Sequence, residues 1–393
     1  MASRETFYVQ VIGIVSFALS ALVSVALTIT CDVRWLILAV FLAAFCVAIS
    51  RAARWIRDGT RLAETLLWIS VLNVLLLLPE LTLRAVDFSF VSGIQFGYPR
   101  PEHFVRFEPD AARFWKLQPS RSGINSWGFH GHEVVPPAAG TCRIVFLGDS
   151  CMEHGYAKHQ DYPSETVQFL KNASFRKQPI DFVSLAVPGY TSYQGRKTVE
   201  RYGGSLDATI AIVAYGWNDQ WLAYGAADAD RRVSVVRTKV YNNVRSLQLL
   251  RRVVSSFRKP QVASNQVRVP TEQYRQNLTA IAEALMSKGV IVVLLTPPTS
   301  HYALGVPQHL VDLGLAKNKE SVTAMHSANN QVVREVAAHT GALLFDLEAN
   351  LVELRGDEVD IFSADGIHFT QPGGRRWIAS QLAMFLFGCC NLQ

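Results

Sequence analysis

The stretch that decides the fold is "IVFLGDSCMEHG", residues 144–155, in which four apolar residues run directly into Gly-Asp-Ser. A short, uninterrupted apolar run is typical of a strand that is buried on both faces of a parallel sheet. In an open α/β sheet, functional groups gather in the loops that follow the carboxyl ends of the strands. The sequence therefore places the hydroxyl of Ser150 where such a sheet carries its functional groups.

Further apolar runs follow, separated by stretches with helical periodicity. Counted with the first, the runs cover residues 143–149, 181–187, 208–216, 290–298 and 342–347. Residues 271–289 show the helical pattern, because apolar residues recur every three or four positions between Thr271, a predicted N-cap, and Gly289, a predicted C-cap. The sequence predicts an α/β fold, a three-layer α/β/α sandwich around a five-stranded parallel sheet.

An apolar excess lies at the start of the chain. The composition is 49% hydrophobic with a mean hydropathy of +0.15, which is high for a soluble protein. Residues 7–30 carry no charge over 24 positions, enough to cross a hydrocarbon core of about 30 Å. The sequence predicts a membrane anchor over residues 1–84 with transmembrane helices at 7–30, 33–50 and 62–83. A cleaved signal peptide is the alternative for the first helix, but its apolar run is long and no A-x-A-like site follows it.

The positions of the arginines predict the orientation of this anchor. The loop between the second and third apolar segments holds Arg51, Arg54, Arg57 and Arg61 against one acid, Asp58. Because basic loops stay on the cytoplasmic side, three crossings place the rest of the chain on the extracytoplasmic, periplasmic side of the cytoplasmic membrane. With two crossings it would face the cytoplasm. Residues 85–140 are predicted to be a lead-in that packs on a catalytic domain spanning residues 141–393.

The distribution of charge and the cysteine content limit which binding partners, metals and cofactors are expected. Residues 231–259 contain nine basic and no acidic residues. A solvated helix face is the plainer interpretation, and contact with anionic lipid or an acidic glycan is the alternative. A nucleic-acid partner is not expected outside the membrane. The six cysteines show no C-x-x-C spacing, so the sequence predicts no metal site, and it predicts no cofactor.

Four strand-end segments carry residues suited to one mechanism. Asp149-Ser150 follows the first strand, Gly189 the second, and "GWND", with Asn218, the third, while "SADGIHFTQPGG" near the end of the chain contains Asp365 and His368. A serine becomes a nucleophile when a base takes its proton and a carboxylate holds that base in the right tautomer. The sequence predicts Ser150, His368 and Asp365 in these roles. The amides of Ser150 and Gly189 and the side chain of Asn218 are the predicted oxyanion donors.

These blocks resemble those of the SGNH family of GDSL-type esterases and lipases, over about residues 143–387. The resemblance implies a Ser150 nucleophile, a His368 base with Asp365 as its partner, and Gly189 and Asn218 as oxyanion donors. Two positions depart from the pattern. Membrane-anchored bacterial members often have Arg where His130 stands in "INSWGFHGHE", and the residue after the serine is not usually a cysteine. Five residues near the predicted mouth are candidate substrate contacts: Asp149, Cys151, Tyr190, Trp217 and Asp219.

The sequence therefore predicts a serine-dependent ester hydrolase that acts outside the cytoplasmic membrane, on an O-acylated cell-surface glycan or a small ester. Three alternatives stay open. An O-acyltransferase would pass the acyl group to a sugar hydroxyl and would have a membrane-bound acyltransferase as its partner. A lysophospholipase-like enzyme would draw its substrate from the bilayer. A non-enzymatic scaffold would keep the fold only to bind glycan.

Overall fold

The computed structural model describes residues 79–90, 107–119, 121, 123–153, 161–173, 179–223, 225–257, 265–352 and 361–389. The predicted membrane helices at 7–30 and 33–50, and most of the one at 62–83, lie outside these residues. Among the helices that are described, none has the length and apolar character needed to cross a bilayer. The chain divides into two compact units, one formed by residues 1–92 with 234–260 and the other by residues 93–233 with 261–393.

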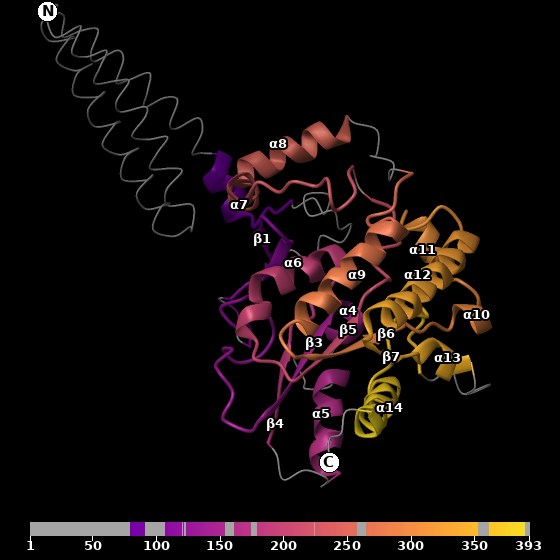
Figure 1. The fold of residues 1–393 in the computed structure, drawn as a ribbon. Helices are drawn as coiled ribbons and strands as arrows, with labels where there is room; N and C mark the ends of the chain where they lie inside the picture. Colours follow the sequence, from indigo (N-terminus) through magenta and orange to yellow (C-terminus); the bar gives the residue numbers. More distant parts are fainter. Residues whose placement is uncertain are drawn as a thin grey trace, which may run out of the picture. The chain divides into compact units, whose positions relative to one another are not determined.

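The larger unit is built on the predicted five-stranded parallel sheet (Figure 1). Its strands, in spatial order, are β4 (Ile180–Ser184), β3 (Cys142–Gly148), β5 (Ile210–Ala214), β6 (Ile291–Leu295) and β7 (Leu343–Phe345). All four pairings are parallel, which confirms the predicted sheet. The order reverses at β3, so the loops after β3 and β5 diverge at a topological switch point, where such sheets bind ligands.

Helices cover both faces of this sheet. One face packs against α5 (Tyr162–Asn172) and α14 (Gly373–Cys389), through a core that includes Ile144 and Phe146 of β3 and Ile212 of β5. On the other side α6 (Ser192–Tyr202), α9 (Thr271–Met286) and α12 (Lys319–Thr340) pack side by side. All seven residues of β3 are buried, as expected for a central strand between two helical layers.

Both predicted caps of α9 were wrong. Thr271 is the first residue of α9, and Pro270 occupies the N-cap position in its place. The side chain of Pro270 cannot accept a hydrogen bond, so this helix begins without the side-chain cap that Thr271 was expected to supply. At the other end the C-cap is Ser287 rather than the predicted Gly289, which lies two residues further on with a left-handed φ of +77°.

The remaining elements of the larger unit are short. A hairpin of β1 (Phe107–Asp110) and β2 (Phe114–Leu117) precedes the sheet. It contacts the loop after β4, because Trp115 Nε1 donates to the carbonyl of Pro188 at 3.2 Å and the Tyr190 hydroxyl donates to the carbonyl of Trp115 at 2.7 Å. The other short elements are α4 (Ser150–Glu153), η4 (Gly203–Ser205), α10 (His301–Leu304), α11 (Gln308–Asp312) and α13 (Leu347–Val352).

The described part of the smaller unit is helical. It consists of a helix over residues 79–85, α7 (Val235–Asn243) and α8 (Arg245–Ser256). The buried side chain of Glu80 accepts hydrogen bonds from the amides of Arg245 and Ser246 at 3.0 and 2.8 Å, so it caps the first turn of α8 from a neighbouring helix. The basic stretch noted in the sequence thus belongs largely to this unit rather than to the sheet.

Candidate active site

Two segments, the start of α4 and the loop before α14, bring a serine, a histidine and an aspartate into contact at the carboxyl end of β3. Ser150 begins α4 directly after the strand, and its Oγ lies 2.8 Å from His368 Nε2. The other ring nitrogen, His368 Nδ1, lies 2.6 Å from Asp365 Oδ2. The structure therefore brings together the three residues that the sequence singled out, in the order hydroxyl, imidazole and carboxylate that activates a serine.

Asp365 is fixed as an ionised acceptor. Its Oδ1 accepts from the amides of Ile367 and His368 at 2.9 and 3.0 Å and from the Ser363 hydroxyl at 3.1 Å. Burial acts to raise the pKa of Asp365, but the hydrogen bonds from the His368 ring and from these amides lower it well below its usual value. The carboxylate therefore keeps its charge near neutral pH and favours the His368 tautomer that carries its proton on Nδ1.

The loop after β6, which was not among the predicted site segments, holds the loop with Asp365 and Gly366 in place. After β6, the Thr299 hydroxyl donates to the carbonyl of Gly366 at 2.9 Å, and His301 Nε2 lies 2.7 Å from the carbonyl of Asp365. Gly366 has a φ of +70°, and a Cβ there would lie 2.5 Å from the His301 ring. Burial lowers the pKa of His301, so its imidazole stays neutral and donates from Nε2 to the carbonyl. The only sequence feature that could have pointed to Thr299 and His301 is that their loop follows a predicted strand.

Two of the three predicted oxyanion donors are backbone amides, those of Ser150 and Gly189. The Ser150 amide opens α4, where a helix has no internal acceptor for it. Gly189 adopts a φ of +79°, and its amide has no hydrogen-bond acceptor within the described residues. Arg268 Nη1 donates to the Gly189 carbonyl at 2.8 Å and is itself paired with Asp228 at 3.0 Å, which fixes the orientation of this peptide.

Asp149 has a different place from the one that the sequence suggested. It was a candidate substrate contact, but it is only 2% exposed. Its Oδ2 accepts from Asn218 Nδ2 at 3.0 Å and its Oδ1 accepts from the Cys151 amide at 2.9 Å. Burial raises the pKa of Asp149, and these two donors act against that rise. The carboxyl group therefore positions Asn218 and the first turn of α4.

Two other candidate substrate contacts, Tyr190 and Asp219, are also buried in the interior. Tyr190 is fully buried and donates its hydroxyl proton to the Trp115 carbonyl. Asp219 is fully buried, accepts from the amide and hydroxyl of Ser192, and has its pKa raised to about 7 by burial. Both residues hold the loops around the site, so we assign them to its scaffold.

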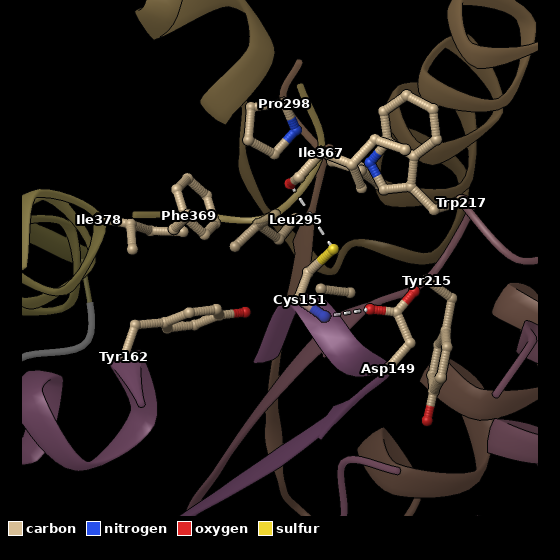
Figure 2. Close-up of a pocket in the computed structure, with 12 residues that line it drawn as sticks. Asp149, Cys151, Tyr162, Tyr215, Trp217, Leu295, Pro298, Ile367, Phe369 and Ile378 are labelled. Carbon is tan, nitrogen blue, oxygen red and sulfur yellow. Dashed lines mark hydrogen bonds between the residues drawn. The ribbon is translucent and has the colours of Figure 1, made fainter. Parts of the chain in front are cut away.

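Cys151 and Trp217, the remaining candidates, line a small cavity together with Asp149 (Figure 2). The cavity volume is about 20 Å³, room for about one water molecule. Its walls are mostly apolar, with Tyr162, Ile367 and Phe369 closing it opposite Asp149. Cys151 Sγ points to the Ile367 carbonyl at 3.8 Å, and burial raises the pKa of its thiol well above the usual value, so it is a packing group rather than a thiolate.

A second cavity of about 240 Å³ lies next to the Asn218 loop. Trp221 lines it and stacks on Trp217, which lines the small cavity, with ring centroids 5.8 Å apart. Four of its other lining residues are polar, Gln220, Asn265, Lys317 and Ser321, and the rest are apolar. Both amide atoms of Gln220 are buried and lack a hydrogen-bond partner among the described residues.

A comparison with known protein families covers the residues of this site. The model of the GDSL-like lipase/acylhydrolase family matches residues 146–376, more than half of the chain. The chain belongs to the GDSL-like lipase/acylhydrolase family. The matched region contains Ser150, Gly189, Asn218, Asp365 and His368, so the resemblance found in the sequence is confirmed at the level of the family. Family membership makes this GDSL-like acylhydrolase a carboxylic ester hydrolase.

Solved structures resemble the chain more distantly. A lipase/acylhydrolase from Enterococcus faecalis is 16% identical, with a TM-score of 0.42, and the match covers 63% of this chain and 96% of that one. The esterase EstA from Pseudoalteromonas sp. is 14% identical, with a TM-score of 0.38 and coverage of 62% and 98%. An acetyl xylan esterase, AlAXEase, is also 14% identical, with a TM-score of 0.42 and coverage of 62% and 99%. No curated protein matches the chain.

Proposed function

We propose that this GDSL-like acylhydrolase cleaves small acyl esters from a cell-surface glycan through an acyl-enzyme at Ser150. The observation that carries the proposal is the unbroken contact from Ser150 Oγ to His368 Nε2 at 2.8 Å and from His368 Nδ1 to Asp365 at 2.6 Å. Such a chain of contacts gives a neutral hydroxyl a base within reach and gives the resulting imidazolium a carboxylate partner.

The chemistry proceeds in two halves. His368 takes the Ser150 proton as Oγ attacks the ester carbonyl carbon, and the oxyanion is met by the amides of Ser150 and Gly189 and by Asn218. The intermediate collapses as His368 returns the proton to the leaving alcohol, which departs and leaves an acyl-serine. Water then enters, loses a proton to His368 and attacks the acyl carbon, and a second collapse restores the Ser150 hydroxyl.

The size of the small cavity favours a short acyl group. A volume of about 20 Å³ lined by Asp149 and Cys151 does not admit a long hydrocarbon chain. Trp217 Nε1 is buried there without an acceptor among the described residues, so it can donate to a small polar group or a water. Among acyl groups an acetyl group is the nearest to this size, and a fatty acyl group, which the lysophospholipase-like alternative requires, is far larger.

The second cavity favours a saccharide as the alcohol part of the ester. An indole from Trp221 and the polar ends of Asn265 and Lys317 are the kinds of group that contact sugar rings and hydroxyls. The cavity also adjoins the loop that carries Asn218. The proposed membrane anchor in residues 1–84 would hold the enzyme at the extracytoplasmic face, where envelope glycan is exposed.

The test compares substrates with the full chain in detergent. Hydrolysis of p-nitrophenyl acetate should exceed that of p-nitrophenyl octanoate and should disappear in Ser150→Ala. Trp221→Ala should raise KM for an O-acetylated oligosaccharide and leave the rate with p-nitrophenyl acetate unchanged. Faster turnover of the octanoate would overturn the short-acyl assignment, and full activity in Ser150→Ala would overturn the mechanism.

Two further measurements separate the remaining alternatives. If isotopically labelled acetyl groups appear on added glycan rather than as free acetate, the enzyme is an O-acyltransferase. A compartment-sensitive reporter fused after residue 393 should be active only outside the cytoplasm. A cytoplasmic signal would overturn the glycan proposal, since that substrate lies on the other side of the membrane.

A further inference from the structure

The smaller unit carries an apolar stripe that faces outward. Five side chains of α8 are exposed: Leu249, Leu250, Val253, Val254 and Phe257, which lies directly after the helix. They recur at intervals of one, three and four residues, the spacing that places side chains on a single face of a helix. The exposed fractions reach 58% for Leu250 and 86% for Phe257. Scattered apolar residues are normal on a surface, but a continuous stripe on one helix marks an interaction surface.

The opposite side of α8 is firmly attached to its own unit. Gln248 is 2% exposed, accepts from the Phe90 amide at 2.9 Å and donates to the Asn242 carbonyl at 2.8 Å. Glu80 caps the first turn and is paired with Arg84 at 2.8 Å. The stripe therefore lies on the side of α8 that faces away from its own unit, and burying it requires an external surface.

The charges around the stripe identify the kind of surface. Residues 234–257 contain five basic residues and no acidic one. Arg251 and Arg252 lie in the middle of α8, with their guanidinium groups over the rings of Tyr241 and Phe88 at 5.7 and 5.8 Å. These ring contacts hold the two arginines beside the apolar stripe. One acidic residue, Asp87, lies 3.9 Å from Arg245 at the start of α8, while the charged side chains of the helix itself are all basic. Apolar side chains with basic ones beside them are typical of helices that lie in the interface of an anionic bilayer.

We propose that α8 is an interfacial helix that rests on an anionic lipid surface, with its apolar stripe among the acyl chains and its arginines at the headgroups. Such helices insert their apolar face about 5–10 Å into the boundary between headgroups and acyl chains. The described part of this unit begins at residue 79, near the end of the segment at 62–83 that the sequence predicts to span the membrane, so the unit would already be at the bilayer surface. The contact is independent of the ester chemistry.

Photolabelling of the full chain tests this proposal. The protein is reconstituted into phosphatidylcholine vesicles, with or without phosphatidylglycerol, that contain a lipid with a photoactivatable acyl chain, and the labelled peptides are mapped by mass spectrometry. Peptides covering residues 249–257 should be labelled in vesicles with phosphatidylglycerol, and salt should weaken this labelling. The peptide with Met384, an exposed apolar residue of α14, is the internal control.

Variants make the result specific to the stripe. Leu250→Ser/Phe257→Ser should reduce labelling of residues 249–257 by roughly tenfold, while Met384→Ser should not change it. Both variants change exposed side chains, so hydrolysis of p-nitrophenyl acetate should be retained, and the labelling should be equal in Ser150→Ala. The proposal is overturned by labelling no higher than that of the Met384 peptide, by labelling that does not depend on phosphatidylglycerol, or by cross-links between α8 helices of two copies.

Discussion

The contact between Asp149 and Asn218 leads to a sharp prediction about catalysis. In Asp149→Asn, the oxygen of the new amide can still accept from the Cys151 amide, but its NH₂ group then faces Asn218 Nδ2, which donates to Asp149 Oδ2 at 3.0 Å in the native protein. Two donors cannot satisfy each other, so Asn218 must rotate away. We expect kcat to fall by about 10²–10³, the cost of losing one oxyanion donor, equivalent to about 2.7–4 kcal/mol.

The assay measures kcat and KM for p-nitrophenyl acetate in matched variants. Asp219→Asn is the control, because it makes the same chemical change at a buried aspartate of the same loop, whose partner is Ser192. Asp219→Asn should keep kcat within a few-fold of the native value. Asn218→Ala should lose as much as Asp149→Asn, and the double variant should lose no more than either, because both remove the same donor.

Two results would refute this reasoning. If Asp149→Asn retained native kcat while Asn218→Ala lost two orders of magnitude, Asn218 would not depend on Asp149 for its position. If the two losses multiplied in the double variant, the residues would act separately. A melting temperature measured for each variant distinguishes a lost donor from a lost fold.

Three further predictions concern stability and the His368 loop. Burial raises the pKa of Asp219 to about 7, so its contribution to stability is complete below about pH 4, declines as pH rises and is lost above pH 7. In urea titrations, the unfolding free energy of the native protein relative to Asp219→Asn should drop by about 2.6 kcal/mol between pH 5 and pH 8. An unfolding free energy that does not change with pH would contradict this prediction. Gly366→Ala should lower both the melting temperature and kcat, because its Cβ would lie 2.5 Å from the His301 ring. Gly341→Ala is the control, because a Cβ there would have no atom within 4 Å. It should cost only the strain of its positive φ, about 1 kcal/mol of unfolding free energy, and should leave kcat unchanged. Asp365→Asn should reduce kcat by about 10⁴, as the same change does in a serine protease triad, because the amide favours the wrong His368 tautomer; a loss below tenfold would argue against its role.

The sequence was sufficient to predict the sheet and the convergence of the reactive residues. Parallel strands are buried on both faces, so the five strands appear as continuous apolar runs that can be recognised without knowledge of their neighbours. Once the strands are known, the ends of the strands lie at one edge of the sheet, and Ser150 and Asn218 must lie near one another.

Other features depend on contacts that sequence spacing does not reveal. The role of Asp149 follows from its burial and from a partner 69 residues away, whereas the sequence shows only a polar residue beside a serine. His301 meets Asp365 across 64 residues of chain, so its position could be suspected from the strand end but its contact could not. The grouping of α8 with residues 79–90 rests on Glu80, which caps a helix 165 residues further along.

The most direct test of the central claim is whether Ser150 is an activated nucleophile. The full chain is treated with a small alkyl fluorophosphonate, and the mass of the protein and the modified peptide are followed with time. The account predicts one adduct, on Ser150, that is absent in Ser150→Ala and forms much more slowly in His368→Ala. An adduct on another residue, or none on a folded protein, would contradict it.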